Sequence, residues 1–66
     1  MNDADVQFDN HGTIWLITPL TPEARQWVEE NVVIEPWQRF GGGFAAEPRL
    51  VQNLMAGMTQ AGLIIR

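Results

Sequence analysis

The stretch TIWLITPLTPEAR, residues 13–25, passes from a strand pattern to a helix pattern and decides the fold. Residues 13–18 are dense in the β-branched and aromatic side chains that favour strands. Pro19 ends the strand because it has no amide hydrogen to donate to a sheet. Thr21 can cap the free amides of a helix and Pro22 suits the first helical position, so a helix is predicted to begin here. Residues 14–17 are all apolar and would face both sides of a sheet, which predicts a central strand.

The residues before this stretch predict a β-hairpin. Val6 and Phe8 alternate with Gln7 and Asp9, as in a strand with one buried face. Residues 9–12, Asp-Asn-His-Gly, are all turn formers. Two strand-like runs on either side of such a turn favour a hairpin that joins the first strand to the central one.

Two amphipathic helices follow in the sequence. Each has apolar residues at helical spacing on one side and polar residues on the other. Pro48 marks the start of the second helix and Gly62 a cap just beyond its end. Gly57, inside that helix, costs about 1 kcal/mol relative to alanine and points to close packing. The apolar positions are Ala24, Trp27, Val28 and Val32 in the first helix, and Leu50, Val51, Leu54, Met55 and Met58 in the second.

The order of elements predicts a single α+β domain over residues 1–66. Residues 44–46 and 63–65 read as further short strands, which gives the order ββαβαβ. Two strand-helix-strand units of the same hand place both helices on one face. The expected fold is a two-layer sandwich with a small mixed sheet of about four strands. Adjacent strand residues point opposite ways, so some of residues 14–16 would leave apolar surface on the open face.

Composition argues against several classes of function. The net charge is −4 and the four arginines are spread along the chain, so we expect no duplex nucleic-acid partner and no membrane surface. Cysteine, serine and lysine are absent, and His11 falls in a predicted turn, so we expect no enzyme, no metal and no cofactor. The three glycines at 41–43 are not followed by the lysine and serine or threonine of a phosphate-binding loop, and they do not form a Gly-x-Gly-x-x-Gly pattern. The acidic start and the absence of cysteine favour a cytoplasmic protein.

The best candidate binding residues are Trp37, Arg39, Phe40 and Phe44, which surround the three glycines. Aromatic residues and arginine are over-represented at protein-binding hot spots. The alternative is that these rings complete a small core. Pro36 disfavours helix at the residue before it, and residues 37–43 fit either a short strand or an ordered loop.

The segment from His11 to Arg25 resembles one in small uncharacterised bacterial and phage-associated proteins, in which a His-Gly-Thr turn leads a strand into Pro-Leu-Thr and then a helix. Residues 40–42, 47–49 and 57–63 are also similar to that group. The resemblance covers most of the chain and implies one compact domain. It carries no implied activity, because the shared residues belong to turns and caps.

Three functions remain open from the sequence. The first is a small non-catalytic module that binds or regulates another protein. The second is a self-associating structural protein, a homodimer that buries the edge strand at 63–65 and the apolar sheet face. The third is an acidic phage-type inhibitor that occupies the basic site of a nucleic-acid enzyme.

Overall fold

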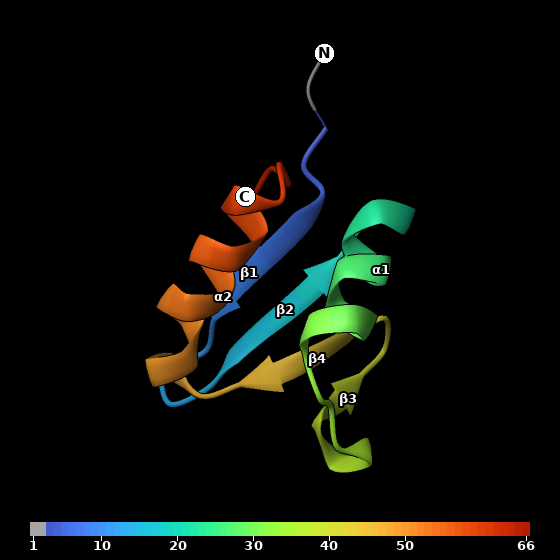
Figure 1. Cartoon of the computed structure of the whole chain (residues 1–66). Coiled ribbons are helices and arrows are strands. Elements are labelled where there is room, and N and C mark those ends of the chain that lie inside the picture. Colours follow the sequence, from blue (N-terminus) through green and yellow to red (C-terminus); the bar gives the residue numbers. More distant parts are fainter. Residues whose placement is uncertain (1–2) are drawn as a thin grey trace.

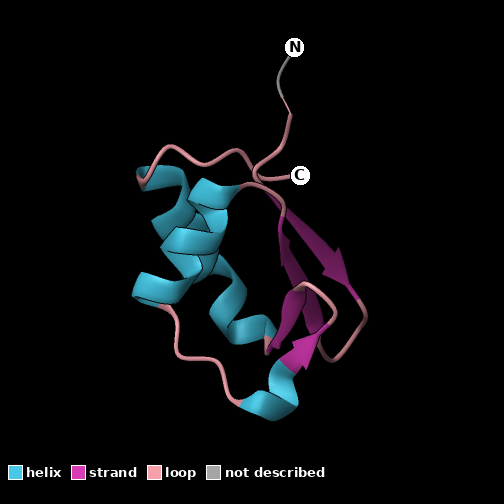
Figure 2. Cartoon of the chain, turned by 90° about the vertical axis from the view of Figure 1, so that its right-hand side faces the viewer, coloured by secondary structure: helices cyan, strands magenta, loops and turns pink. Residues whose placement is uncertain are grey.

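A computed structural model describes residues 3–66 as an α+β domain with a four-stranded antiparallel sheet. Two helices cover one face of that sheet, which confirms the predicted two-layer arrangement (Figure 1). Figure 2 shows the two layers from the side, with the helices in one and the strands in the other. The elements are β1 (Val6–Asn10), β2 (Trp15–Pro19), α1 (Pro22–Asn31), the single 3₁₀ turn η1 (Pro36–Gln38), β3 (Arg39–Phe40), β4 (Gly43–Ala46) and α2 (Pro48–Gln60).

The strand β2 lies inside the sheet, as predicted, in the spatial order β1-β2-β4-β3. It pairs with β1 through the expected hairpin, with Phe8 opposite Ile17. The turn is held by the Gly12 amide, which donates to the Asn10 side-chain oxygen at 2.8 Å. Gly12 has φ +87°, a conformation that glycine adopts without strain. The turn predicted from residues 9–12 is therefore confirmed.

The chain between the two helices forms two short strands: β4, where the sequence predicted a strand, and β3, in the segment that fitted either a strand or a loop. β3 and β4 make a tight hairpin around Gly41 and Gly42, and β4 pairs antiparallel with β2. Gly41 supplies the positive φ of +57° that this turn uses. The connection from β2 through α1 therefore ends in an antiparallel neighbour, and the right-handed rule for parallel crossovers does not apply to it.

The last residues add a fragment of parallel strand beside β1. Ile65 bridges to Val6, and the Arg66 amide donates to the Val6 carbonyl at 3.0 Å. The Phe8 amide donates in turn to the Arg66 carbonyl at 2.9 Å. The predicted strand at 63–65 is thus a single parallel bridge, and the four strands of the sheet, expected to be mixed, all pair antiparallel.

Local signals set the helix ends. Thr21 caps α1, because its hydroxyl accepts from the Ala24 amide at 3.2 Å, and Pro22 follows in the first turn. α2 begins at Pro48 and is followed by Gly62 at φ +87°, which confirms the predicted cap. Gly57 of α2 faces Trp27 of α1, and a Cβ at Gly57 would lie 2.8 Å from the indole ring. The close packing expected at this glycine is therefore a helix-to-helix contact.

The core lies between the helix layer and the covered face of the sheet. Ile17 and Met58 are fully buried, and Phe44 is 2% exposed. The core residues are Val6, Ile17, Ala24, Val28, Phe44, Ala46 and Met58. Both helices and three of the four strands contribute to it, which makes one continuous core.

The strand register decides what each sheet face carries. Phe8, Ile17 and Phe44 are paired across the sheet and point to the helices, whereas Asp9, Leu16 and Ala45 are paired on the opposite, open face. The open face is mixed: it carries half-buried Leu16 and Asp9 together with the buried Ala45. Trp15 shares the helix side with Ala46. Of the residues expected to leave apolar surface on the open face, Leu16 lies there, Trp15 does not, and Ile14 precedes the strand.

Candidate binding surface

The segment between α1 and β4 is ordered by its own hydrogen bonds. The Gln38 amide donates to the Glu35 carbonyl, and the Glu35 amide donates to the Gln38 side-chain oxygen, both at 2.9 Å. The Arg39 amide donates to the Pro36 carbonyl and joins η1 to β3. Residues 37–43 are therefore a 3₁₀ turn followed by a hairpin, which answers the question of strand or loop.

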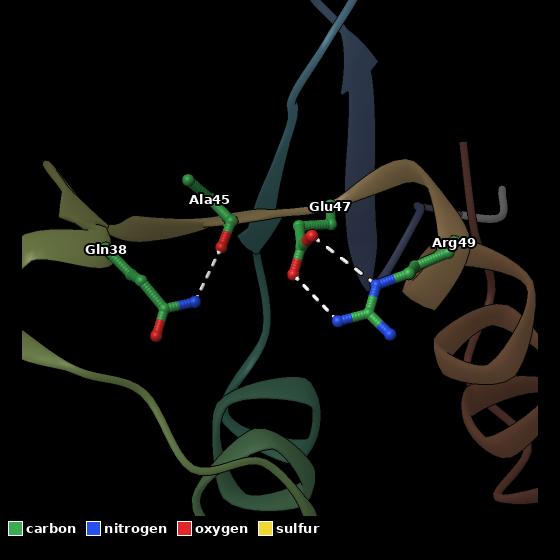
Figure 3. A network of polar contacts seen from close by, with 4 residues as sticks. All are labelled: Gln38, Ala45, Glu47 and Arg49. Atoms are coloured by element: carbon green, nitrogen blue, oxygen red, sulfur yellow. Dashed lines mark hydrogen bonds and ion pairs between the residues drawn. The ribbon is translucent and has the colours of Figure 1, made fainter.

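Gln38 fastens this segment to the sheet. Its side-chain amide donates to the Ala45 carbonyl at 3.0 Å, as Figure 3 shows. Ala45 is 1% exposed, so the carbonyl lies in a region where an unpaired polar group is costly. Figure 3 also shows the neighbouring pair of Arg49 and Glu47, whose closest N···O distance is 3.2 Å. Glu47 raises the pKa of Arg49, first through the hydrogen bond and then through its charge.

Three large apolar side chains of this segment point into solvent. Val33 is 86% exposed, Trp37 71% and Phe40 53%. These are the three most exposed large hydrophobic residues among residues 3–66, and all lie between positions 33 and 40; the others are Leu20, Leu50 and Ile64, at 38–44%. We call Val33, Trp37 and Phe40 the exposed apolar segment.

The structure separates the four candidate residues that the sequence grouped together. Trp37 and Phe40 are exposed, whereas Phe44 is a core residue at 2% exposure. Arg39 pairs with Phe44 and therefore points to the helix side of β3, away from Phe40. The sequence could not show this division, because it depends on the hairpin register.

A cavity of about 350 Å³ lies between α1 and the β3–β4 hairpin, on the side to which Arg39 points. Its charged lining comes from Arg25 and Glu29 of α1 and from Arg39 of β3. We call it the arginine pocket. Its other lining residues are Pro19, Val28, Val32, Ile34, Gly42, Gly43 and Phe44.

A second hollow of about 440 Å³ lies between α1 and α2. Its apolar lining includes Trp27, Leu50 and Leu54, and its polar lining consists of side-chain amides: Asn31, Gln38 and Asn53. Val33 of the exposed apolar segment reaches this interhelical groove as well. No charged residue lines it among those that the structure describes.

The chemistry available for catalysis is sparse in the described part of the chain. His11 is exposed in the β1–β2 turn, and Glu29 and Glu30 are exposed on α1. Within residues 3–66 no group of three or more histidine or acidic residues could hold a metal ion. The helices described are also too short and too polar to cross a bilayer.

Comparisons with protein-family models, with curated proteins and with solved structures found no match. The resemblance of residues 11–25 to small bacterial and phage-associated proteins therefore stays a prediction. What this molecule does has to follow from its own surfaces.

Proposed function

We propose that this chain is a small non-catalytic module that binds another protein through Val33, Trp37 and Phe40. One observation supports this most: the three most exposed large apolar side chains among residues 3–66 all belong to one short segment. Exposed apolar residues scattered singly are ordinary on protein surfaces, whereas these three fall within eight consecutive residues, 33–40. A cytoplasmic location, favoured by the cysteine-free composition, is part of the same proposal.

The energetics of the segment fit binding. Full burial of one such side chain is worth about 1.5–3 kcal/mol, so the segment offers a partner several kcal/mol of apolar burial. Large aromatic rings supply contact area at low conformational cost. Gln38 already holds the backbone in place through Ala45, so less entropy is lost when a partner binds.

The test is a double substitution, Trp37→Ala with Phe40→Ala, in the full chain. We expect the free energy of unfolding to change by less than about 1 kcal/mol, because both rings are exposed. Partner capture from a lysate of the source organism, quantified by mass spectrometry, should be lost. The matched control is Leu20→Ala with Ile64→Ala, which removes exposed apolar groups elsewhere and should leave capture intact. Equal capture by wild type and the aromatic double variant would contradict the proposal.

Self-association is a second candidate, and the sheet edge at the C-terminus favours it. Ile64 is 44% exposed beside a strand fragment held to the sheet by the Ile65–Val6 bridge. A sheet edge presents unpaired backbone N–H and C=O groups that can pair with a second copy. Light scattering at two protein concentrations tests it: a dimer should dissociate on Ile64→Arg substitution, and a monomer at high concentration would exclude this candidate.

A further inference from the structure

The four arginines differ in what they contact. Arg49 donates to the Glu47 carboxylate, and Arg66 donates to the Gln7 side-chain oxygen at 2.7 and 3.1 Å. The side chains of Arg25 and Arg39 make no hydrogen bond and no ion pair with any other residue in the described range 3–66. A guanidinium is always charged and has five N–H donors, so these two retain their capacity to bind an anion.

Both of these arginines line the arginine pocket, although they come from different elements. Arg25 lies on α1, and Arg39 reaches the cavity from β3 because it shares the helix side of the hairpin with Phe44. Glu29, one turn after Arg25 on α1, is the one acidic residue among the lining residues. The lining therefore keeps one net positive charge in a chain whose net charge is −4. This is where the fold concentrates its unpaired positive charge.

The rest of the lining is apolar. Val28 is 5% exposed and Phe44 2%, and both are core residues. Val32 and Ile34 pack against the same core and line the same cavity. At about 350 Å³ the cavity is within the range of roughly 300–1,000 Å³ that small-molecule sites occupy. A ligand that suits it has an anionic head for the arginines and a short apolar part for Val32 and Ile34, which are half-buried and line the cavity.

We propose that the arginine pocket binds the carboxylate of a monoanionic ligand that carries an apolar tail. Arginine matches a carboxylate through two parallel N–H···O bonds. Glu29 in the lining disfavours a doubly charged phosphate, because like charges in one cavity repel. The carboxylate can belong to a free aliphatic acid or to the C-terminus of a peptide that ends in an apolar residue. The site does not depend on the proposed function, because it faces the helix side of β3 and Phe40 faces the other.

The experiment is a titration of the isotope-labelled full chain with sodium hexanoate, followed by amide NMR. The reporters are Gly42 and Gly43, which line the cavity. We expect saturable shifts at these amides, and none of that size with hexanol, which has the same tail without charge. Arg25→Gln and Arg39→Gln should each weaken binding about tenfold, the effect of losing a charged hydrogen bond. Arg49→Gln, whose side chain lies outside the cavity, is the matched control and should bind as the wild type does.

A third substitution should change the affinity for hexanoate in the opposite direction. Glu29→Gln removes the one acidic group of the lining and should strengthen hexanoate binding several-fold, most clearly at low salt. All these side chains are exposed or line open space, and circular dichroism checks that each variant folds. Equal shifts with hexanol and hexanoate, shifts centred on the interhelical groove, or no saturable shift in the millimolar range would each overturn the proposal.

A second pair of ligands distinguishes the sources of the carboxylate. A tetrapeptide that ends in leucine is compared with the same peptide as its C-terminal amide. Tighter binding of the free-acid peptide than of hexanoate, lost on amidation, assigns the pocket to a peptide C-terminus. Binding of hexanoate alone assigns it to a small aliphatic acid. If neither ligand binds in a manner that depends on Arg25, the proposal is wrong.

Discussion

The two ends of the sheet differ in the side chains that lie at their surfaces. At the end where the C-terminus and the start of β1 lie, polar groups join three distant parts of the chain. β3 lies at the opposite end (Figure 1), and there the side chains of Trp37 and Phe40 are exposed. The first end is closed by Asp5, whose carboxylate accepts from the Thr21 hydroxyl at 2.9 Å and from the Ile64 amide at 2.8 Å. One end therefore stabilises a small fold, and the other carries the exposed side chains of the proposed binding segment.

Backbone hydrogen bonds of Asp5 also hold this closed end together. The Asp5 amide donates to the Ile64 carbonyl, and the Leu20 amide donates to the Asp5 carbonyl, both at 2.7 Å. Asp5 thus joins the start of β1, the start of α1 and the C-terminal bridge. A chain of 66 residues has a net stability of roughly 3–10 kcal/mol, so one such junction is a large fraction of it.

The largest effect is therefore expected from Asp5→Ala. It removes two side-chain hydrogen bonds of a charged acceptor, and we expect the free energy of unfolding to fall by about 2–3 kcal/mol in urea titrations. Asp3→Ala, at an exposed neighbouring position, is the control and should change stability by less than about 0.5 kcal/mol. If the two variants were equally stable, the closed end would not have the role described.

The next largest effect on stability is expected at Gly43, in the β3–β4 hairpin. A Cβ at Gly43 would lie 2.5 Å from the Ile17 carbonyl oxygen, which is backbone and cannot move aside. Gly43→Ala should cost about 2 kcal/mol, the usual scale of overpacking. Gly42→Ala meets nothing within 4 Å and is the matched control in the same turn. Equal thermal stability of the two variants would show that the hairpin is not packed against β2 in this way.

The third prediction couples stability to binding. Gln38→Ala leaves the buried Ala45 carbonyl unpaired and frees η1, so we expect a loss of about 1–2 kcal/mol. Partner capture should also weaken, although Trp37 and Phe40 are intact. Gln26→Ala, which removes an exposed hydrogen bond to Glu30, controls for the loss of a surface amide. Unchanged capture by the Gln38 variant would show that a preorganised segment is not needed.

The sequence predicts the parts of this fold that local chemistry determines. The Asn10–Gly12 turn, the Thr21 cap and the Gly62 cap each depend on residues within a few positions of one another in the chain. The central position of β2 follows from a short apolar run. These features need no knowledge of distant contacts.

The sequence does not predict the parts that depend on register or on long-range contacts. Phe40 and Phe44 are both aromatic and lie four residues apart, yet the turn between them sends one to solvent and the other into the core. A shift of one residue in the hairpin would exchange the two faces. The Asp5–Ile64 bond spans 59 residues, and the arginine pocket forms only when α1 and β3 come together. Candidate residues could therefore be listed from the sequence, but not assigned to surfaces.

The smallest effect on stability is expected from Trp37→Ala, and it is the sharpest test of the comparison. With 71% of the side chain exposed, the indole contributes little to the folded state, and the free energy of unfolding should change by less than about 0.5 kcal/mol. The other two tryptophans are half-buried, so the emission of Trp37 should be the one most easily quenched by acrylamide, and its loss should remove that accessible fraction. A drop in stability similar to that of Asp5→Ala would mean that the ring supports the fold, and the exposed end would then have no surplus apolar surface to offer a partner.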